Sequence, residues 1–193
     1  MNARAFAFLP ASLLALIIGV FVLVPNAMVW LAFKREAFLG GELWRLVTFP
    51  FVHVSASHLF ENIVAFFVAT LLAYEAELTV AQYALAVVFS TLVVAAIDVA
   101  WLPTLVLAGA SSAIFAVYGA FAMKGSMFVQ RRWLIVILGA TIMTKYGVAA
   151  ATGSIESGIM LQTLLHVAGF LSGLAVIFVC GNLARANKRR MLT

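Results

Sequence analysis

Residues 158–182 read GIMLQTLLHVAGFLSGLAVIFVCGN, a mainly apolar stretch that contains no Asp, Glu, Lys or Arg. A helix needs about 20 mainly apolar residues to cross the hydrocarbon core of a bilayer. This stretch is long enough, and it carries one histidine, His166, well inside the run. It therefore predicts a membrane-spanning helix with a single imidazole in it.

The whole chain has the same character. Hydrophobic residues make up 65% of it and charged residues only 10%, whereas soluble domains carry about 25% charged residues. A water-soluble fold is excluded, and the length leaves room for little beyond six or seven spans. We expect an all-α membrane protein, one domain over residues 1–193, built as a six-helix bundle. The expected spans are 5–24, 57–76, 79–100, 109–125, 132–151 and 158–182.

Residues 25–56 separate the first two apolar runs and are too polar and too broken by Gly and Pro to form a span. They include Trp44 and Arg45, residue types that anchor chains at the membrane surface. We expect a long interfacial first loop here. The first run, residues 5–24, is interpreted as an uncleaved span because Pro25-Asn26 makes a poor signal-peptide cleavage site.

The basic residues indicate topology. Their net excess of +5 does not indicate nucleic-acid binding, because they sit between apolar runs and not on a face interleaved with aromatics. With six spans, eight Lys and Arg residues fall on the side of the termini and four on the other side, which predicts that both termini are cytoplasmic. The eight are Arg4, Lys124, Arg131, Arg132, Arg185, Lys188, Arg189 and Arg190; the four are Lys34, Arg35, Arg45 and Lys145.

Polar side chains inside apolar runs are the first candidates for function, since each needs a partner in a bilayer. His58 and Asn62, four residues apart, share one face of the second span. Ser111 lies at the start of the fourth span, where free backbone N–H groups favour a developing oxyanion. His166 shares a face with Gly169 and Gly173, and such small residues let a neighbouring helix approach.

These residue types fit serine hydrolysis, because a serine hydroxyl becomes a good nucleophile when an adjacent neutral histidine takes its proton. Taken singly, each has a structural explanation. A serine in a membrane helix usually bonds to its own backbone, and a histidine often bridges two helices. Their coincidence at the outer depth of three spans favours a Ser111–His166 dyad, since no carboxylate is placed to complete a triad.

Four motifs, in order along nearly the whole chain, resemble the rhomboid family of intramembrane proteases. Trp44-Arg45 resembles its Trp-Arg pair, and residues 53–62, HVSASHLFEN, resemble its His-x4-His-x3-Asn element. Residues 109–111, GAS, resemble its nucleophile motif, and residues 166–173, HVAGFLSG, resemble its histidine helix.

The resemblance implies a serine endopeptidase that cuts single-pass transmembrane proteins near the non-cytoplasmic boundary, in the inner membrane of a prokaryotic cell. It implies Ser111 as nucleophile, His166 as base, and an oxyanion hole of His58, Asn62 and the Ser111 N–H. No cofactor or metal is implied. The supporting residues are Gly109, Phe115, Gly169, Gly173, Trp44, Arg45 and His53.

Three features depart from the family or add to it. Ser112 stands where the family usually has glycine, and Phe115 stands where it often has tyrosine and can stack on His166. Glu61 lies within a span at a depth similar to that of Lys145, which suggests a pair at the substrate entrance. The alternative is that Glu61 reaches water.

Other functions account for less of the pattern. A catalytically silent rhomboid-like binder of transmembrane segments typically lacks the serine or the histidine. A transporter would show paired broken helices. A metal site of His53, His58 and Glu61 is disfavoured because residues five apart point in different directions on a helix. The substrate, the oligomeric state and a rhombosortase-like role stay open.

Overall fold

The computed structural model describes residues 3–101, 106–124 and 157–191. Within these ranges the long helices are five: α1 (Ala3–Leu23), α5 (Ala56–Glu75), α6 (Val80–Trp101), α7 (Ser111–Lys124) and α9 (Ser157–Arg190). Short elements connect them: α2 (Ala27–Trp30), β1 (Phe33–Lys34), α3 (Arg35–Leu39), α4 (Arg45–Thr48), the 3-10 helix η1 (Phe49–Phe51) and β2 (Val106–Leu107).

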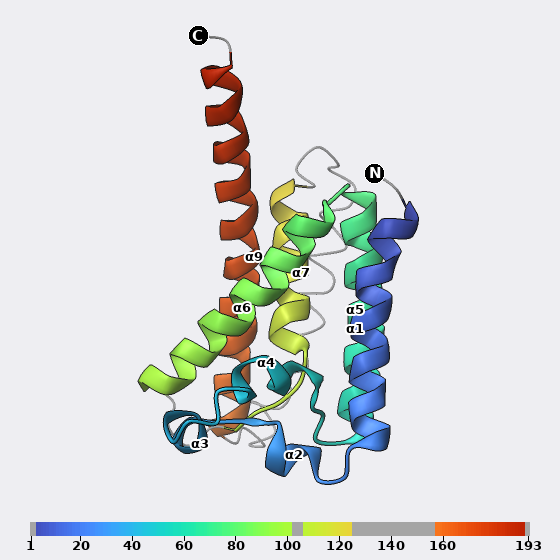
Figure 1. The fold of residues 1–193 in the computed structure, drawn as a ribbon, viewed down its shortest axis with the longest axis vertical. Helices are drawn as coiled ribbons and strands as arrows, with labels where there is room; N and C mark the ends of the chain where they lie inside the picture. Colours follow the sequence, from blue (N-terminus) through green and yellow to red (C-terminus); the bar gives the residue numbers. More distant parts are fainter. Residues whose placement is uncertain (1–2, 102–105, 125–156, 192–193) are drawn as a thin grey trace.

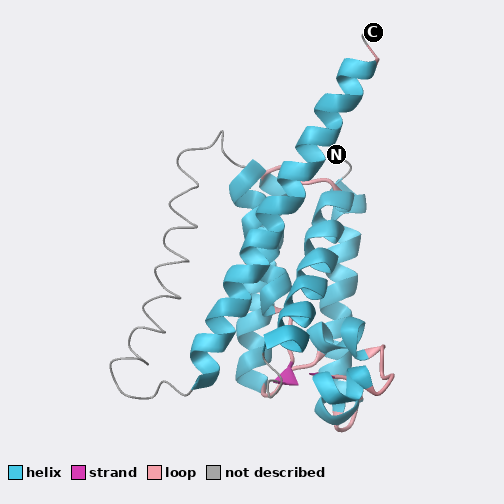
Figure 2. Cartoon of the chain, turned by 90° about the vertical axis from the view of Figure 1, so that its left-hand side faces the viewer, coloured by secondary structure: helices cyan, strands magenta, loops and turns pink. Residues whose placement is uncertain are grey.

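Helix α7 is the centre of the bundle, packed against α5, α6 and α9 (Figure 1). Helices make up most of the described chain (Figure 2). Most of its side chains are buried, including Ala116, Val117 and Ala120. Its 14 residues span about 21 Å, less than the roughly 30 Å hydrocarbon core. Helix α7 alone is therefore too short to cross that core.

Among the described residues, four helices are long and apolar enough to cross a membrane: Phe6–Leu23, Ala56–Glu75, Val80–Trp101 and Leu161–Asn187. Large apolar side chains on their outer faces are exposed, for example Phe67 and Phe89. The protein is therefore a mostly helical, multi-pass membrane protein. The expected span 132–151 lies outside the described residues, so the count of six spans stays a prediction.

The start of α1 and the end of α9 lie at one end of the bundle, and the loop between α1 and α5 lies at the other (Figure 1). This loop holds α2, β1, α3, α4 and η1. Strand β1 pairs antiparallel with β2, Phe33 opposite Leu107 and Lys34 opposite Val106. The expectation of an all-helical fold misses this small sheet, because two-residue strands leave no periodic signal in the sequence.

Helix α9 runs further than the expected span, to Arg190 instead of residue 182. No proline stops it, and Lys and Arg are good helix formers that also favour a helix C-terminus. Its apolar window of 27 residues is about 40 Å long and exceeds the hydrocarbon core. The basic end of α9 therefore extends out of the membrane interior.

Arg45 anchors the first loop. It is buried, and its guanidinium donates to a Glu42 carboxylate oxygen at 2.6 Å, to the Ala32 carbonyl at 2.6 Å and to the Val29 carbonyl at 2.9 Å. A planar guanidinium can meet acceptors in several directions at once, which a lysine cannot do. One side chain thus holds together segments on both sides of β1.

Replacing Arg45 with methionine should destabilise the protein by about 2–3 kcal/mol, because buried acceptors lose a charged donor. Thermal unfolding in detergent measures this. Lys34→Met removes another cation from the same loop and should change the unfolding temperature little. An Arg45→Met protein as stable as the Lys34→Met control would contradict this role.

Candidate active site

Ser111 is the first residue of α7, and the turn before it requires glycine. Gly109 has φ +104°, a conformation that favours glycine, and a Cβ there would lie 2.7 Å from the Cε1 atom of His58. The Gly109 N–H donates to the Phe49 carbonyl at 3.0 Å, which ties this turn to η1. Ser111 therefore sits at a helix N-terminus, where the first N–H groups lack partners within the helix.

Helices α7 and α9 touch backbone to backbone. A Cβ placed on Gly169 would overlap the carbonyl oxygen of Ser112, and one placed on Gly173 would overlap that of Ala116. At such a close approach of two helix backbones, weak Cα–H···O contacts take the place of side-chain contacts. The first of these two contacts lies about one turn along α9 from His166, and close packing is kept with serine at position 112.

This contact brings the serine and the histidine together. The Nε2 atom of His166 lies 2.9 Å from the Oγ atom of Ser111, within hydrogen-bond distance. The Phe115 ring stacks on the His166 ring, with centroids 4.6 Å apart and an angle of 7° between the planes. Phe115 therefore restricts rotation of the imidazole and holds Nε2 toward Ser111.

His58 and Asn62 approach from α5. The Ser55 hydroxyl caps this helix by accepting from the His58 N–H at 3.1 Å, which fixes the first turn. The His58 ring then lies against Gly109. Asn62, buried one turn further on, donates its Nδ2 to the His58 carbonyl at 2.8 Å. A second Nδ2 hydrogen is left to meet an oxyanion.

His53 lies behind His58, with ring centroids 5.1 Å apart. It precedes α5 and is buried. Burial, and secondly the neighbouring charge of His58, lowers the pKa of His53 to about 4, while a backbone hydrogen bond with Phe51 acts the other way. His53 is thus neutral near pH 7 and adds no charge to the site.

The depressed pKa of His53 makes the protein less stable in mild acid. An unfolded chain binds the proton near pH 6.5 and the folded one only near pH 4, so the stability present above pH 6.5 is lost as the pH falls toward 4. Between pH 7.5 and pH 4.5 the unfolding temperature should fall less steeply for His53→Gln than for the natural chain. If the unfolding temperatures of the two proteins fell equally with pH, His53 would not be the cause of the acid sensitivity.

Other predicted residues lie away from these contacts. Trp44 donates its indole N–H to the Trp30 carbonyl at 3.1 Å and, with Arg45, supports the loop. Glu61 is exposed, and its suggested partner Lys145 lies outside the described residues. Over the described ranges 3–101, 106–124 and 157–191, no cluster of three metal-ligating residues occurs.

Asp98 is a buried polar residue that sequence reasoning missed. It lies on α6, fully buried, within electrostatic reach of Glu36 and Arg35 on α3. Neither carboxylate oxygen has a hydrogen-bond partner in the part of the chain that is described. The sequence does indicate it, because an acidic residue inside an apolar run is costly in a membrane and is therefore a candidate for function.

A multi-pass helical bundle with a serine at a central helix start and a histidine in contact with it defines the class of protein: a membrane protein with a serine-hydrolase-like pair. Comparison with protein families matches residues 40–183 to the Rhomboid domain, and no curated protein matches the chain. The chain belongs to the rhomboid family, a family of intramembrane serine proteases.

Proposed function

We propose that this protein is an active intramembrane serine endopeptidase, a single domain with six spans. The observation that carries the proposal is the 2.9 Å contact between Ser111 Oγ and His166 Nε2. A catalytically silent relative has no need to keep this pair in bonding geometry, with an aromatic ring stacked on the histidine.

In the proposed reaction His166 Nε2 takes the Ser111 proton as Oγ attacks the scissile carbonyl carbon. The carbonyl oxygen becomes an oxyanion, which the Ser111 N–H and the side chains of His58 and Asn62 stabilise. The C–N bond then breaks, and His166 gives its proton to the leaving amine. Water, deprotonated by His166, hydrolyses the acyl-enzyme and restores Ser111.

Single-pass transmembrane proteins are the proposed substrates. A peptide bond inside a helix is covered by the helical hydrogen-bond ladder, so the segment must unwind before it meets Ser111. Helix α7 begins toward the loop end of the bundle, opposite the termini (Figure 1), and Ser111 is its first residue. With cytoplasmic termini, as the charge distribution predicts, cleavage falls near the non-cytoplasmic boundary, in the inner membrane of a prokaryotic cell.

The test uses purified protein in liposomes with a fluorophosphonate and a panel of single-pass substrates. Ser111 should be labelled, and the label should be lost in His166→Ala, because the neutral hydroxyl reacts slowly without its base. Substrate cleavage should be lost in the same variant. An unlabelled Ser111 in folded protein would instead indicate a silent binder of transmembrane segments.

A further inference from the structure

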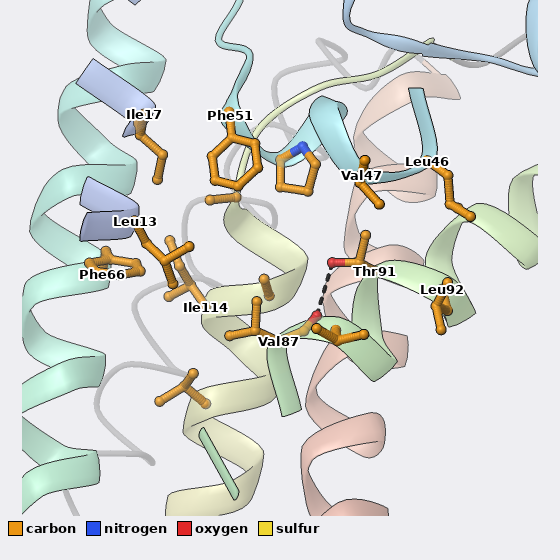
Figure 3. Close-up of a pocket in the computed structure, with 15 residues that line it drawn as sticks. Leu13, Ile17, Leu46, Val47, Phe51, Phe66, Val87, Thr91, Leu92 and Ile114 are labelled. Carbon is orange, nitrogen blue, oxygen red and sulfur yellow. Dashed lines mark hydrogen bonds between the residues drawn. The ribbon is translucent and has the colours of Figure 1, made fainter. Parts of the chain in front are cut away.

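An apolar cavity of about 270 Å³ lies on the side of α7 that faces α1 and α6 (Figure 3). Leu13 and Ile17 of α1 form one wall and Ile114 of α7 forms another. Pro50 and Phe51 of η1 close it toward the loop end. The cavity is thus bordered by α1, α5, α6 and α7 and by the first loop, and neither Ser111 nor His166 lines it.

The lining offers almost nothing to a polar ligand. Its one side chain with a polar group, Thr91, already donates its hydroxyl to the Val87 carbonyl at 2.9 Å (Figure 3). A buried water needs two to four polar partners, and cavities without them stay dry. Water and polar small molecules are therefore poor occupants.

The cavity opens toward the surrounding lipid along α6. Val88 and Leu92 line it and are 56% and 45% exposed on a helix long and apolar enough to span the membrane. Val47 of α4, at the loop end, is 61% exposed. The space is thus continuous with the hydrocarbon around the protein. The ligands available there are the acyl chains of lipids.

We propose that this cavity is a binding site for one acyl chain of a membrane phospholipid. A dry apolar cavity of about 150 Å³ is enough to bind benzene, so this larger, open one accommodates a chain segment. The driving force is not the hydrophobic effect, since the chain leaves an apolar medium. It is the van der Waals contact that the lining lacks when the space is empty.

The bound chain also contacts the framework of the candidate site. Ala110, which lines the cavity, directly precedes Ser111. Pro50 follows Phe49, whose carbonyl accepts from the Gly109 N–H. An acyl chain in the cavity therefore supports both η1 and the turn that positions Ser111.

The experiment uses the full chain in phosphatidylcholine liposomes with a trace of phosphatidylcholine that carries a diazirine in one acyl chain. After illumination, mass spectrometry maps the labelled residues. Ile114 is only 2% exposed and Ala113 5%, so a lipid outside the protein does not reach them. We expect label at these two residues, and the same label in Ser111→Ala, which separates this result from the proposed proteolysis.

Thr91→Phe places a ring in the cavity and should reduce labelling of Ile114 severalfold. Val88→Phe, at the exposed rim, is a second variant in case the first does not fold. Leu85→Phe adds similar bulk to the exposed face of α6 outside the lining and should leave the label unchanged. The proposal is overturned if label is confined to exposed residues, if both filling variants keep it, or if a single-pass peptide displaces it.

Discussion

Replacing Ser111 with alanine is expected to lower substrate cleavage by about six orders of magnitude, because it removes the hydroxyl that contacts His166 Nε2 and would form the acyl-enzyme. His166→Ala should cost about as much. The double variant should be no worse than either single variant, since nucleophile and base act as one unit. Initial rates in liposomes, from a single substrate, measure all three.

Ser112 provides the matched control. It is the next residue, is buried, and also carries a hydroxyl, but its backbone carbonyl faces Gly169 on α9. Ser112→Ala should cleave at close to the natural rate and should still be labelled by a fluorophosphonate. If Ser112→Ala lost cleavage and Ser111→Ala kept it, the nucleophile would be Ser112 and not Ser111.

Hydrophobic runs alone predict where most helices lie. Residues 57–76 and 79–100 differ by one residue at each end from α5 and α6. Helix α9 is longer than the expected span 158–182, because hydrophobicity reports where the membrane ends, while the helix continues on backbone propensity to Arg190. The β1–β2 pair was missed because it joins segments about 70 residues apart with no local pattern.

The residues of the candidate site could be proposed from their types and spacing, but the contacts among them could not. That Ser111 and His166 lie 2.9 Å apart depends on how closely α7 and α9 pack, which is a tertiary property. The role of Arg45 in the loop depends on carbonyls 13 and 16 residues away. Asp98 could have been found, because a carboxylate inside an apolar run is visible in the sequence.

Glycine packing leads to the second large expected effect, in Gly169→Ala. Alanine favours a helix over glycine by up to about 1 kcal/mol, so propensity alone predicts stabilisation. Here the new Cβ overlaps the Ser112 carbonyl, a backbone atom that cannot rotate away, and overpacking of this kind costs about 1–3 kcal/mol. The overlap outweighs the propensity, and α9 must move away from α7.

Movement of α9 separates His166 from Ser111, and a displacement of about 1 Å can cost about 100-fold in rate. We expect that loss of cleavage in Gly169→Ala, with weaker fluorophosphonate labelling and a lower unfolding temperature. Gly181→Ala is the control: it lies on the same helix, a Cβ there meets nothing within 4 Å, and propensity alone acts. Because one substitution should cost activity and the other should not, equal rates in the two variants would show that the glycine contact does not set the distance between Ser111 and His166.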